Sequence, residues 1–342
     1  MKNQKWFFII SLCCISGIVH SQDVHFSQFF DAPLLRNPSL AGIFNGDVRA
    51  QGVYRSQWGS VTRPYQTGSF DVEIKKPIGR ANDFITYGMQ ILYDRAGDIN
   101  FTTTNILPAV NYHKSLNGNK RKFLSLGFMG GLVQRRIDRS KMTTNNHFDG
   151  FGYNPALPDG ETFPTSNYKY WDGSVGISYN SSLGESEVSN FFIGLAYHHF
   201  NRPVNSFYKN PPIELNPKWV ASGGVKLFVN EFSYVSFQAD ISMQGDNKEI
   251  IGGGMYSRKI GDDMDNPLYT LHLGAYMRWK DAIIPVIKLD YNPFSIAFSY
   301  DVNTSALKTA SQYRGGFELS IAYIGFDKIG YSTKDAVLCP KF

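Results

Sequence analysis

Segments of about ten residues, in which apolar and polar side chains alternate, recur from Gly46 to Ile324. A period of two places all the apolar side chains on one face of a β-strand. Four weaker segments lie at 101–113, 123–135, 249–257 and 283–291; Pro108 and Pro285 fall inside two of them and weaken the pattern there. Counting all segments predicts about fourteen strands, each near the 9–11 residues that a tilted membrane strand needs.

Alternation alone does not separate a membrane barrel from a soluble β-sandwich, which turns its apolar face inward. Three features favour the barrel. The strands are long for a sandwich. Many apolar stripes end in Tyr or Trp, the residues of interfacial girdles: Tyr93, Tyr112, Trp171, Tyr179, Trp219, Trp279, Tyr291 and Tyr323. The two longest connections, about 137–170 and 201–217, both follow odd-numbered strands, so they lie on one side. The connection at 258–267, on the other side, is the exception. The sequence therefore predicts an all-β outer-membrane barrel with antiparallel strands at residues 45–324.

The first residues carry the marks of an exported protein. Lys2 and Lys5 precede the apolar run Trp6–Val19, which is too short to span a bilayer. This pattern predicts a signal peptide at residues 1–21, cleaved between Ser21 and Gln22. Cys339 is then the one cysteine of the mature chain, so no disulfide framework is expected.

The stretch 22–44 does not alternate. It is aromatic, it contains Pro33 and Pro38, and it cannot form a lipid-facing strand. We expect it to fill the lumen as a partial plug or to lie across the periplasmic mouth, held by Phe26, Phe29, Phe30 and Leu35. Residues 325–342 form a tail beyond the last predicted strand, and we expect both termini in the periplasm.

Catalytic constellations are weak, and we expect neither an enzyme nor a cofactor. His198 and His199 are adjacent, so on a strand they point to opposite faces and cannot readily share a metal ion. Asp262, Asp263 and Asp265 lack the Gly and distal Glu of a calcium loop. The net charge is +5 without a block of Lys or Arg, so no nucleic-acid partner is expected.

A set of charged residues shares the inward phase of the predicted strands. These residues either line a channel or, as we prefer, pair with one another in a polar interior: Arg49, Arg55, Asp71, Glu73, Asp94, Asp172, Asp240, Asp301, Arg314 and Glu318. The long loop carries Phe148-Asp149-Gly150-Phe151-Gly152-Tyr153, and such a loop either binds a partner or folds over the pore.

Three short motifs point to a family. They are Phe26-Ser27-Gln28-Phe29, the box from Asn37-Pro38 to Gly42, and Tyr54-Arg55-Ser56-Gln57-Trp58. Together with the ending Cys339-Pro340-Lys341-Phe342, they resemble the PorP/SprF family of type IX secretion in Bacteroidetes. Ser39 stands where the family's box usually has Ala.

The resemblance implies a non-enzymatic barrel that acts in type IX secretion and gliding. Its partners would be outer-membrane lipids and either the secretion and gliding machinery or one large secreted adhesin. It would help to export a partner protein or retain it at the surface. Two alternatives remain open at this stage: a passive pore or transporter of hydrophobic compounds, and a soluble exported β-sandwich adhesin.

Overall fold

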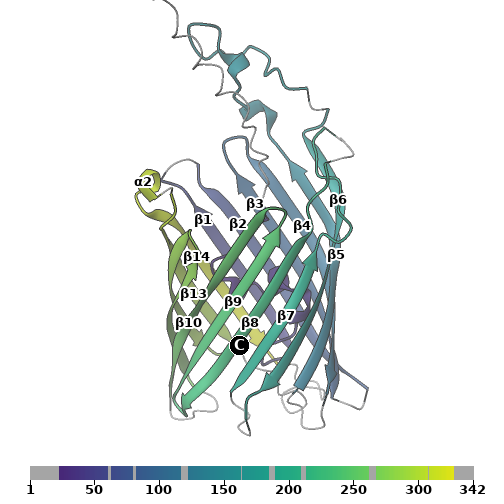
Figure 1. Cartoon of the computed structure of the whole chain (residues 1–342), viewed down its shortest axis with the longest axis vertical. Helices are drawn as coiled ribbons and strands as arrows, with labels where there is room; N and C mark the ends of the chain where they lie inside the picture. Colours follow the sequence, from purple (N-terminus) through teal and green to yellow (C-terminus); the bar gives the residue numbers. More distant parts are fainter. Residues whose placement is uncertain are drawn as a thin grey trace, which may run out of the picture.

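The computed structural model describes residues 23–60, 63–79, 82–116, 122–162, 164–184, 189–208, 213–261, 267–306 and 308–326. In these residues fourteen strands form a closed antiparallel barrel, in which each strand pairs with its neighbours in sequence (Figure 1). The ring closes where β1 pairs with β14, from Val48 opposite Gly325 to Gln57 opposite Gly316. The predicted fold class is confirmed.

The strands follow the predicted segments closely. They are β1 (Val48–Gln57), β2 (Tyr65–Ile78), β3 (Asp83–Ala96), β4 (Phe101–Ser115), β5 (Lys122–Arg136), β6 (Asn167–Ser182), β7 (Asn190–His198), β8 (Lys218–Asn230), β9 (Ser233–Gln244), β10 (Asn247–Ile260), β11 (Tyr269–Arg278), β12 (Ala282–Tyr291), β13 (Phe294–Asn303) and β14 (Arg314–Gly325).

Helices are few in the described part of the chain, and none has the length and apolarity to cross a bilayer. They are η1 (Phe29–Asp31), α1 (Pro33–Arg36), η2 (Pro38–Leu40), η3 (Arg139–Lys141), η4 (Asn145–His147) and α2 (Lys308–Ser311).

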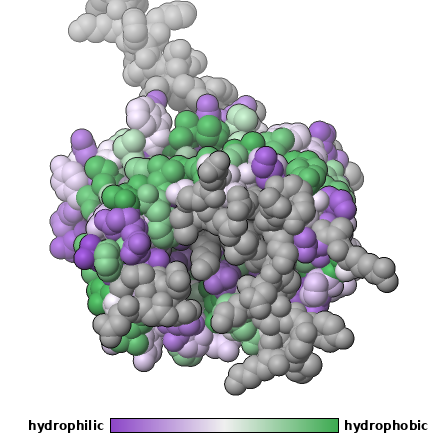
Figure 2. Space-filling model, turned by 90° about the horizontal axis from the view of Figure 1, so that it is seen from below, coloured by the Kyte–Doolittle hydropathy of each residue, from purple (hydrophilic) through white to green (hydrophobic). Residues whose placement is uncertain are grey.

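The wall is apolar outside and polar inside. On β3, Tyr87 and Ile91 are 54% and 42% exposed, whereas Thr86 and Gln90, each one residue earlier, are fully buried. The other strands repeat this arrangement, and hydrophobic side chains are visible around much of the wall in Figure 2. A soluble sandwich would bury these apolar side chains. An outward apolar band instead suits a wall that faces lipid.

The two prolines are accommodated by local gaps in the ladder. The pairing of β4 with β5 skips Leu107 and Pro108, and that of β12 with β13 skips Ile284 and Pro285. Each proline keeps its place opposite the other neighbouring strand, as Pro108 does opposite Met89. A proline lacks the N–H that the missing ladder bond would need.

The two longest connections leave the barrel at the same end. The β5–β6 connection covers residues 137–166 and the β7–β8 connection covers 199–217. Figure 1 shows the β5–β6 loop rising far above the wall, while the opposite end carries short turns such as 231–232 and 292–293. We call these the long-loop end and the short-turn end.

Asp262, Asp263 and Asp265 lie outside the described residues.

Replacing Phe298 with Arg tests the outward face. Phe298 lies in the middle of β13 and is 45% exposed. A cation at mid-depth in lipid should destabilise the barrel by about 2–4 kcal/mol. Urea unfolding in phospholipid vesicles measures this cost. The control is Phe151→Arg in the fully exposed loop, which should leave the unfolding midpoint unchanged; equal costs for both variants would contradict a lipid-facing wall.

Candidate functional site

The segment from Asp23 to Phe44 lies inside the barrel, and we call it the plug. Its first residues are near the long-loop end, where the Asp23 N–H donates to Gln244 Oε1 (3.0 Å). Its last residue is near the short-turn end, where Lys75 Nζ donates to the Phe44 carbonyl oxygen (2.6 Å). Of the predicted anchors, Phe26 and Phe29 are buried, whereas Phe30 and Leu35 are half-buried. The plug therefore runs through the lumen from one end of the barrel to the other.

The Asn37-Pro38-Ser39 box sits on wall positions that have no side chain. A Cβ on Gly127 would lie 2.4 Å from the Pro38 carbonyl carbon, and one on Gly176 would lie 1.9 Å from Asn37 Oδ1. Gly127 and Gly176 are opposite each other on β5 and β6. The glycines therefore allow the plug backbone to touch the sheet directly.

Hydrogen bonds fix the box in that position. Asn37 Oδ1 accepts from the Ser39 N–H (2.9 Å) and caps η2. Asn111 Nδ2 donates to the carbonyl oxygens of Ser39 (2.7 Å) and Ala41 (2.8 Å). Ser178 Oγ donates to the same Ser39 oxygen (3.1 Å). The polar wall thus satisfies backbone groups that no helix or strand would satisfy.

Gly42 ends the box with a backbone that other residues rarely adopt. Its φ is +83°, and a Cβ there would lie 2.1 Å from Thr86 Oγ1. The Gly42 N–H donates to Glu73 Oε2 (2.6 Å), while Arg49 donates to Glu73 Oε1. Glycine therefore brings the chain close enough to share the carboxylate of Glu73 with Arg49.

The Phe26-Ser27-Gln28 motif and the Arg55 motif meet at one carboxylate. The backbone N–H groups of Ser27 and Gln28 donate to the two oxygens of Glu318 (2.6 and 2.7 Å). Arg55 Nε lies 3.1 Å from Glu318 and its Nη2 lies 3.0 Å from Asp301. The motif residue Arg55 thus connects β1, β13, β14 and the plug.

Gln57 and Trp58 of the same motif lie elsewhere. Gln57 is the last residue of β1 and Trp58 follows it, at the long-loop end. Both are half-buried, and the Trp58 ring packs on Tyr65 with centroids 5.1 Å apart. They line the space above the plug and do not anchor it.

Further ion pairs join the plug to the wall. Arg36 makes a bidentate ion pair with Asp240 (2.7 and 2.6 Å), and Lys288 Nζ donates to Asp31 Oδ1 (2.8 Å). The Phe30 ring stacks on Tyr276 at 5.1 Å. Removing one partner of such a buried pair leaves an uncompensated charge, which typically costs about 3–5 kcal/mol.

Most of the charged residues with the inward phase face the lumen and are buried there. Those that are buried are Arg49, Arg55, Asp71, Glu73, Asp172, Asp240, Asp301 and Glu318, and Asp94 is half-buried. Arg314 departs from the prediction because it is exposed. Asp301 pairs with Gly316 and Val302 pairs with Arg314, so Gly315 is an extra residue and the alternation breaks there.

His198 and His199 also depart from the predicted geometry, because both are buried in the lumen. His199 follows the end of β7 and has φ of +57°, so the strand alternation no longer applies to it. His198 contacts Ser174 and the Arg36 carbonyl oxygen. Within the described ranges, no three His, Cys, Asp or Glu side chains are placed to hold a metal ion.

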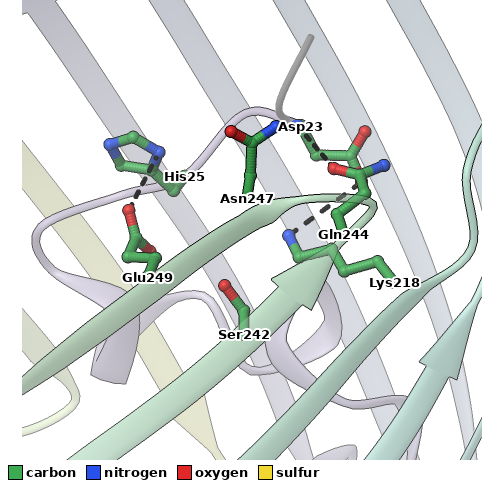
Figure 3. Close-up of a pocket in the computed structure, with 7 residues that line it drawn as sticks. All are labelled: Asp23, His25, Lys218, Ser242, Gln244, Asn247 and Glu249. Carbon is green, nitrogen blue, oxygen red and sulfur yellow. Dashed lines mark hydrogen bonds and ion pairs between the residues drawn. The ribbon is translucent and has the colours of Figure 1, made fainter. Parts of the chain in front are cut away.

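His199 holds the beginning of the plug. Its Nε2 lies 2.6 Å from Asp23 Oδ2 and its Nδ1 lies 2.8 Å from Asp172 Oδ2. Figure 3 shows the other contacts of this region, in which Lys218 lies 3.9 Å from Asp23 and His25 lies 3.3 Å from Glu249. We call the triad Asp23–His199–Asp172 the latch.

Several residues of the interface were not singled out from the sequence. Arg278 and Lys288 have the inward phase of their strands, so alternation could have found them. Arg36 and Asp31 lie in the non-alternating segment, where the sequence gives no phase. Their partners became evident only from the path of the plug.

Taken together, the fold and the lumen define a membrane β-barrel whose interior is occupied by its own N-terminal segment. Residues 18–323 match the profile of the family described as type IX secretion system membrane protein PorP/SprF, and the chain belongs to that family. No curated protein matches the sequence.

Among solved structures, the chain is similar to the Ralstonia pickettii toluene transporter TbuX, with 10% identity, a TM-score of 0.49, and coverage of 87% of this chain and 94% of that one. A Pseudomonas aeruginosa FadL homologue gives 11% identity, a TM-score of 0.47, and coverage of 86% and 94%. CdiB from Acinetobacter baumannii gives 8%, 0.42, and coverage of 81% and 60%.

Gly176→Ala tests the contact between the Asn37 box and the wall. The added methyl group would overlap Asn37 Oδ1, so the box must shift, and we expect a loss of about 1–3 kcal/mol. Hydrogen exchange of the peptide covering residues 37–42 should increase. Gly223→Ala on β8 is the matched control, since its nearest neighbour would be 3.7 Å away; equal protection in the two variants would sink the proposed contact.

The latch predicts a response to pH. Burial disfavours the charged form of His199, but the carboxylates of Asp23 and Asp172 outweigh it and raise the His199 pKa to about 9. This stabilisation is complete below pH about 6.5 and is lost as pH rises through about 9.

Hydrogen exchange of residues 23–36, corrected for intrinsic rates, should therefore increase between these pH values. His199→Gln should remove the response, and residues 37–44 should not show it. A profile that is identical in the wild type and the variant would refute the latch.

Proposed function

We propose that this protein is a non-enzymatic outer-membrane component of type IX secretion that assists the export or surface retention of a partner protein. Membership of the PorP/SprF family supports a role with the secretion machinery. The partner is either a component of the secretion and gliding apparatus or a large secreted adhesin. The proposal includes a Bacteroidetes source, a signal peptide at residues 1–21 and a periplasmic position for the short-turn end, where β14 ends; the signal peptide and the tail at 327–342 lie outside the described residues. The expectation that both termini lie in the periplasm does not fit this arrangement, because Asp23 is bonded to Gln244 at the long-loop end whereas Ile324 is bonded to Pro293 at the short-turn end.

The occupied lumen carries this proposal. The plug is held by the ion pairs Arg36–Asp240 and Lys288–Asp31, and by the backbone N–H groups of Ser27 and Gln28, which donate to Glu318. Withdrawing it would remove the plug's ion-pair partner from Asp240 and from Lys288 inside the barrel, at a cost of several kcal/mol each. A barrel with a fixed plug is better suited to binding another protein than to passing solutes freely.

The long loop supplies a surface for such a partner. Phe148 and Tyr153 form an antiparallel bridge, and Asp149 Oδ1 accepts from the N–H groups of Phe151 and Gly152. The turn is therefore well held, yet Phe148, Phe151 and Tyr153 are 62%, 100% and 59% exposed. Aromatic side chains that are presented in this way are typical anchors of protein interfaces.

Affinity purification from detergent extracts tests the role and the docking end. Phe151→Ser should reduce recovery of the partner several-fold, whereas Phe232→Ser in a turn at the short-turn end should not. Deletion of the gene should impair surface display of the same partner. Unchanged export after deletion would contradict the role, and the reverse pattern of the two variants would contradict docking on the long loop.

Conductance in planar bilayers tests the alternative of a passive pore. The wild-type protein should stay near the baseline, because the plug occupies the lumen. Gly176→Ala should conduct more often than Gly223→Ala, since only the first displaces the Asn37 box. A stable open channel in the wild type would exclude the plugged barrel.

A further inference from the structure

A cavity remains between the plug and the wall of β1–β6, toward the long-loop end. Its volume is about 330 Å³, at the lower end of the range for sites that hold small molecules. One part of its lining is apolar and is made by Leu92, Leu107, Met129 and Val133 on the wall with Leu35 on the plug. The cavity therefore has a deep apolar region whose shape depends on the plug.

A polar row crosses the wall above this apolar region. Thr67 is opposite Asp94, Asp94 is opposite Thr103, and Thr103 is opposite Arg135. All four residues line the cavity. Because these residues have the inward phase on successive strands, a cation and an acid stand on the same rim, separated by a threonine.

Arg135 differs from the other arginines of the lumen. Arg36, Arg49, Arg55 and Arg278 each have a carboxylate within 4 Å. Among the residues that the structure describes, Arg135 has none within that distance: it is hydrogen-bonded to the Tyr168 side chain and lies 5.7 Å from the Phe101 ring, while Tyr170, Asp23 and Asp94 are its further electrostatic neighbours. Its Nε is buried without a hydrogen-bond partner. Asp94 does not pair with it and instead accepts from Thr67 Oγ1 (2.7 Å).

Another polar atom in the same cavity also lacks a partner within the described part of the chain. Asn105 Oδ1 is buried there and accepts no hydrogen bond. An arginine whose Nε is buried without a partner costs free energy unless a ligand or water satisfies that donor. An anion is the ligand that a guanidinium prefers, and a carboxylate matches its planar geometry.

We propose that this cavity binds a small amphipathic carboxylate, with its head on Arg135 and its apolar chain along Leu92, Leu107 and Val133. The plug contributes Leu35 to the wall of the site, so the ligand and the plug stabilise each other. The proposal is independent of which protein docks on the barrel. The negative charge of Asp94 repels the carboxylate head group, so removing this charge should strengthen binding.

Decanoate is the probe, and binding is measured by titration calorimetry on the full mature protein in nanodiscs. Empty nanodiscs provide the correction for partition into lipid. We expect one saturable site for decanoate and none for decanol, which has the same chain without the charge. Arg135→Gln should weaken binding about tenfold or more, because it removes a charge-assisted hydrogen bond.

Arg136→Gln is the matched control, since the adjacent residue is exposed and does not line the cavity. It should bind decanoate like the wild type. Asp94→Asn should bind more tightly, because it removes the opposing charge. The heat-dependent gel mobility of folded barrels confirms that each variant is folded.

Heat that matches empty nanodiscs would overturn the proposal, as would equal affinities of the Arg135 and Arg136 variants. Weaker binding by Asp94→Asn would also contradict it, because Asp94 would then contribute to binding instead of opposing the head group.

Discussion

Pairing of buried charge is the constraint on which this structure depends. A wall that faces lipid must turn its polar side chains inward, and fourteen strands enclose a lumen too wide for those side chains to fill alone. The plug supplies the missing partners. Glu318 shows this most directly, since it accepts two backbone N–H groups of the plug and also faces Arg55 on the neighbouring strand β1. Without the plug, Asp240 and Lys288 would lose their ion-pair partners Arg36 and Asp31, and Glu318 would lose two of its hydrogen bonds.

The second constraint is close approach. Charges hold the plug at its two ends and along its length, but the Asn37 box touches the sheet itself, and this contact is made where β5 and β6 carry Gly127 and Gly176. The sequence motif in the plug and the glycines in the wall are therefore one feature in space, although about ninety residues or more of chain separate them. An alanine at either wall position would require the plug to move.

The wall was largely predictable from the sequence, because lipid on one side and polar groups on the other impose a strict period of two. The departures have local causes. Arg314 lost its phase at the extra residue Gly315, and His199 lost its phase where the strand ends with a left-handed backbone. The path of the plug was not predictable in detail. Arg36 carries no periodic signal, and its partner Asp240 is 204 residues away, so only the folded barrel could bring the two together.

The closing of the ring at β1 and β14 has a consequence for the order of assembly. Ser27 and Gln28 are bonded to Glu318, which lies on the last strand. These contacts cannot form until β14 has been synthesised and has paired with β1. The segment that leaves the ribosome among the first can therefore reach its final contacts only after the last strand has been made, so that closure of the ring and placement of the plug depend on the same strand.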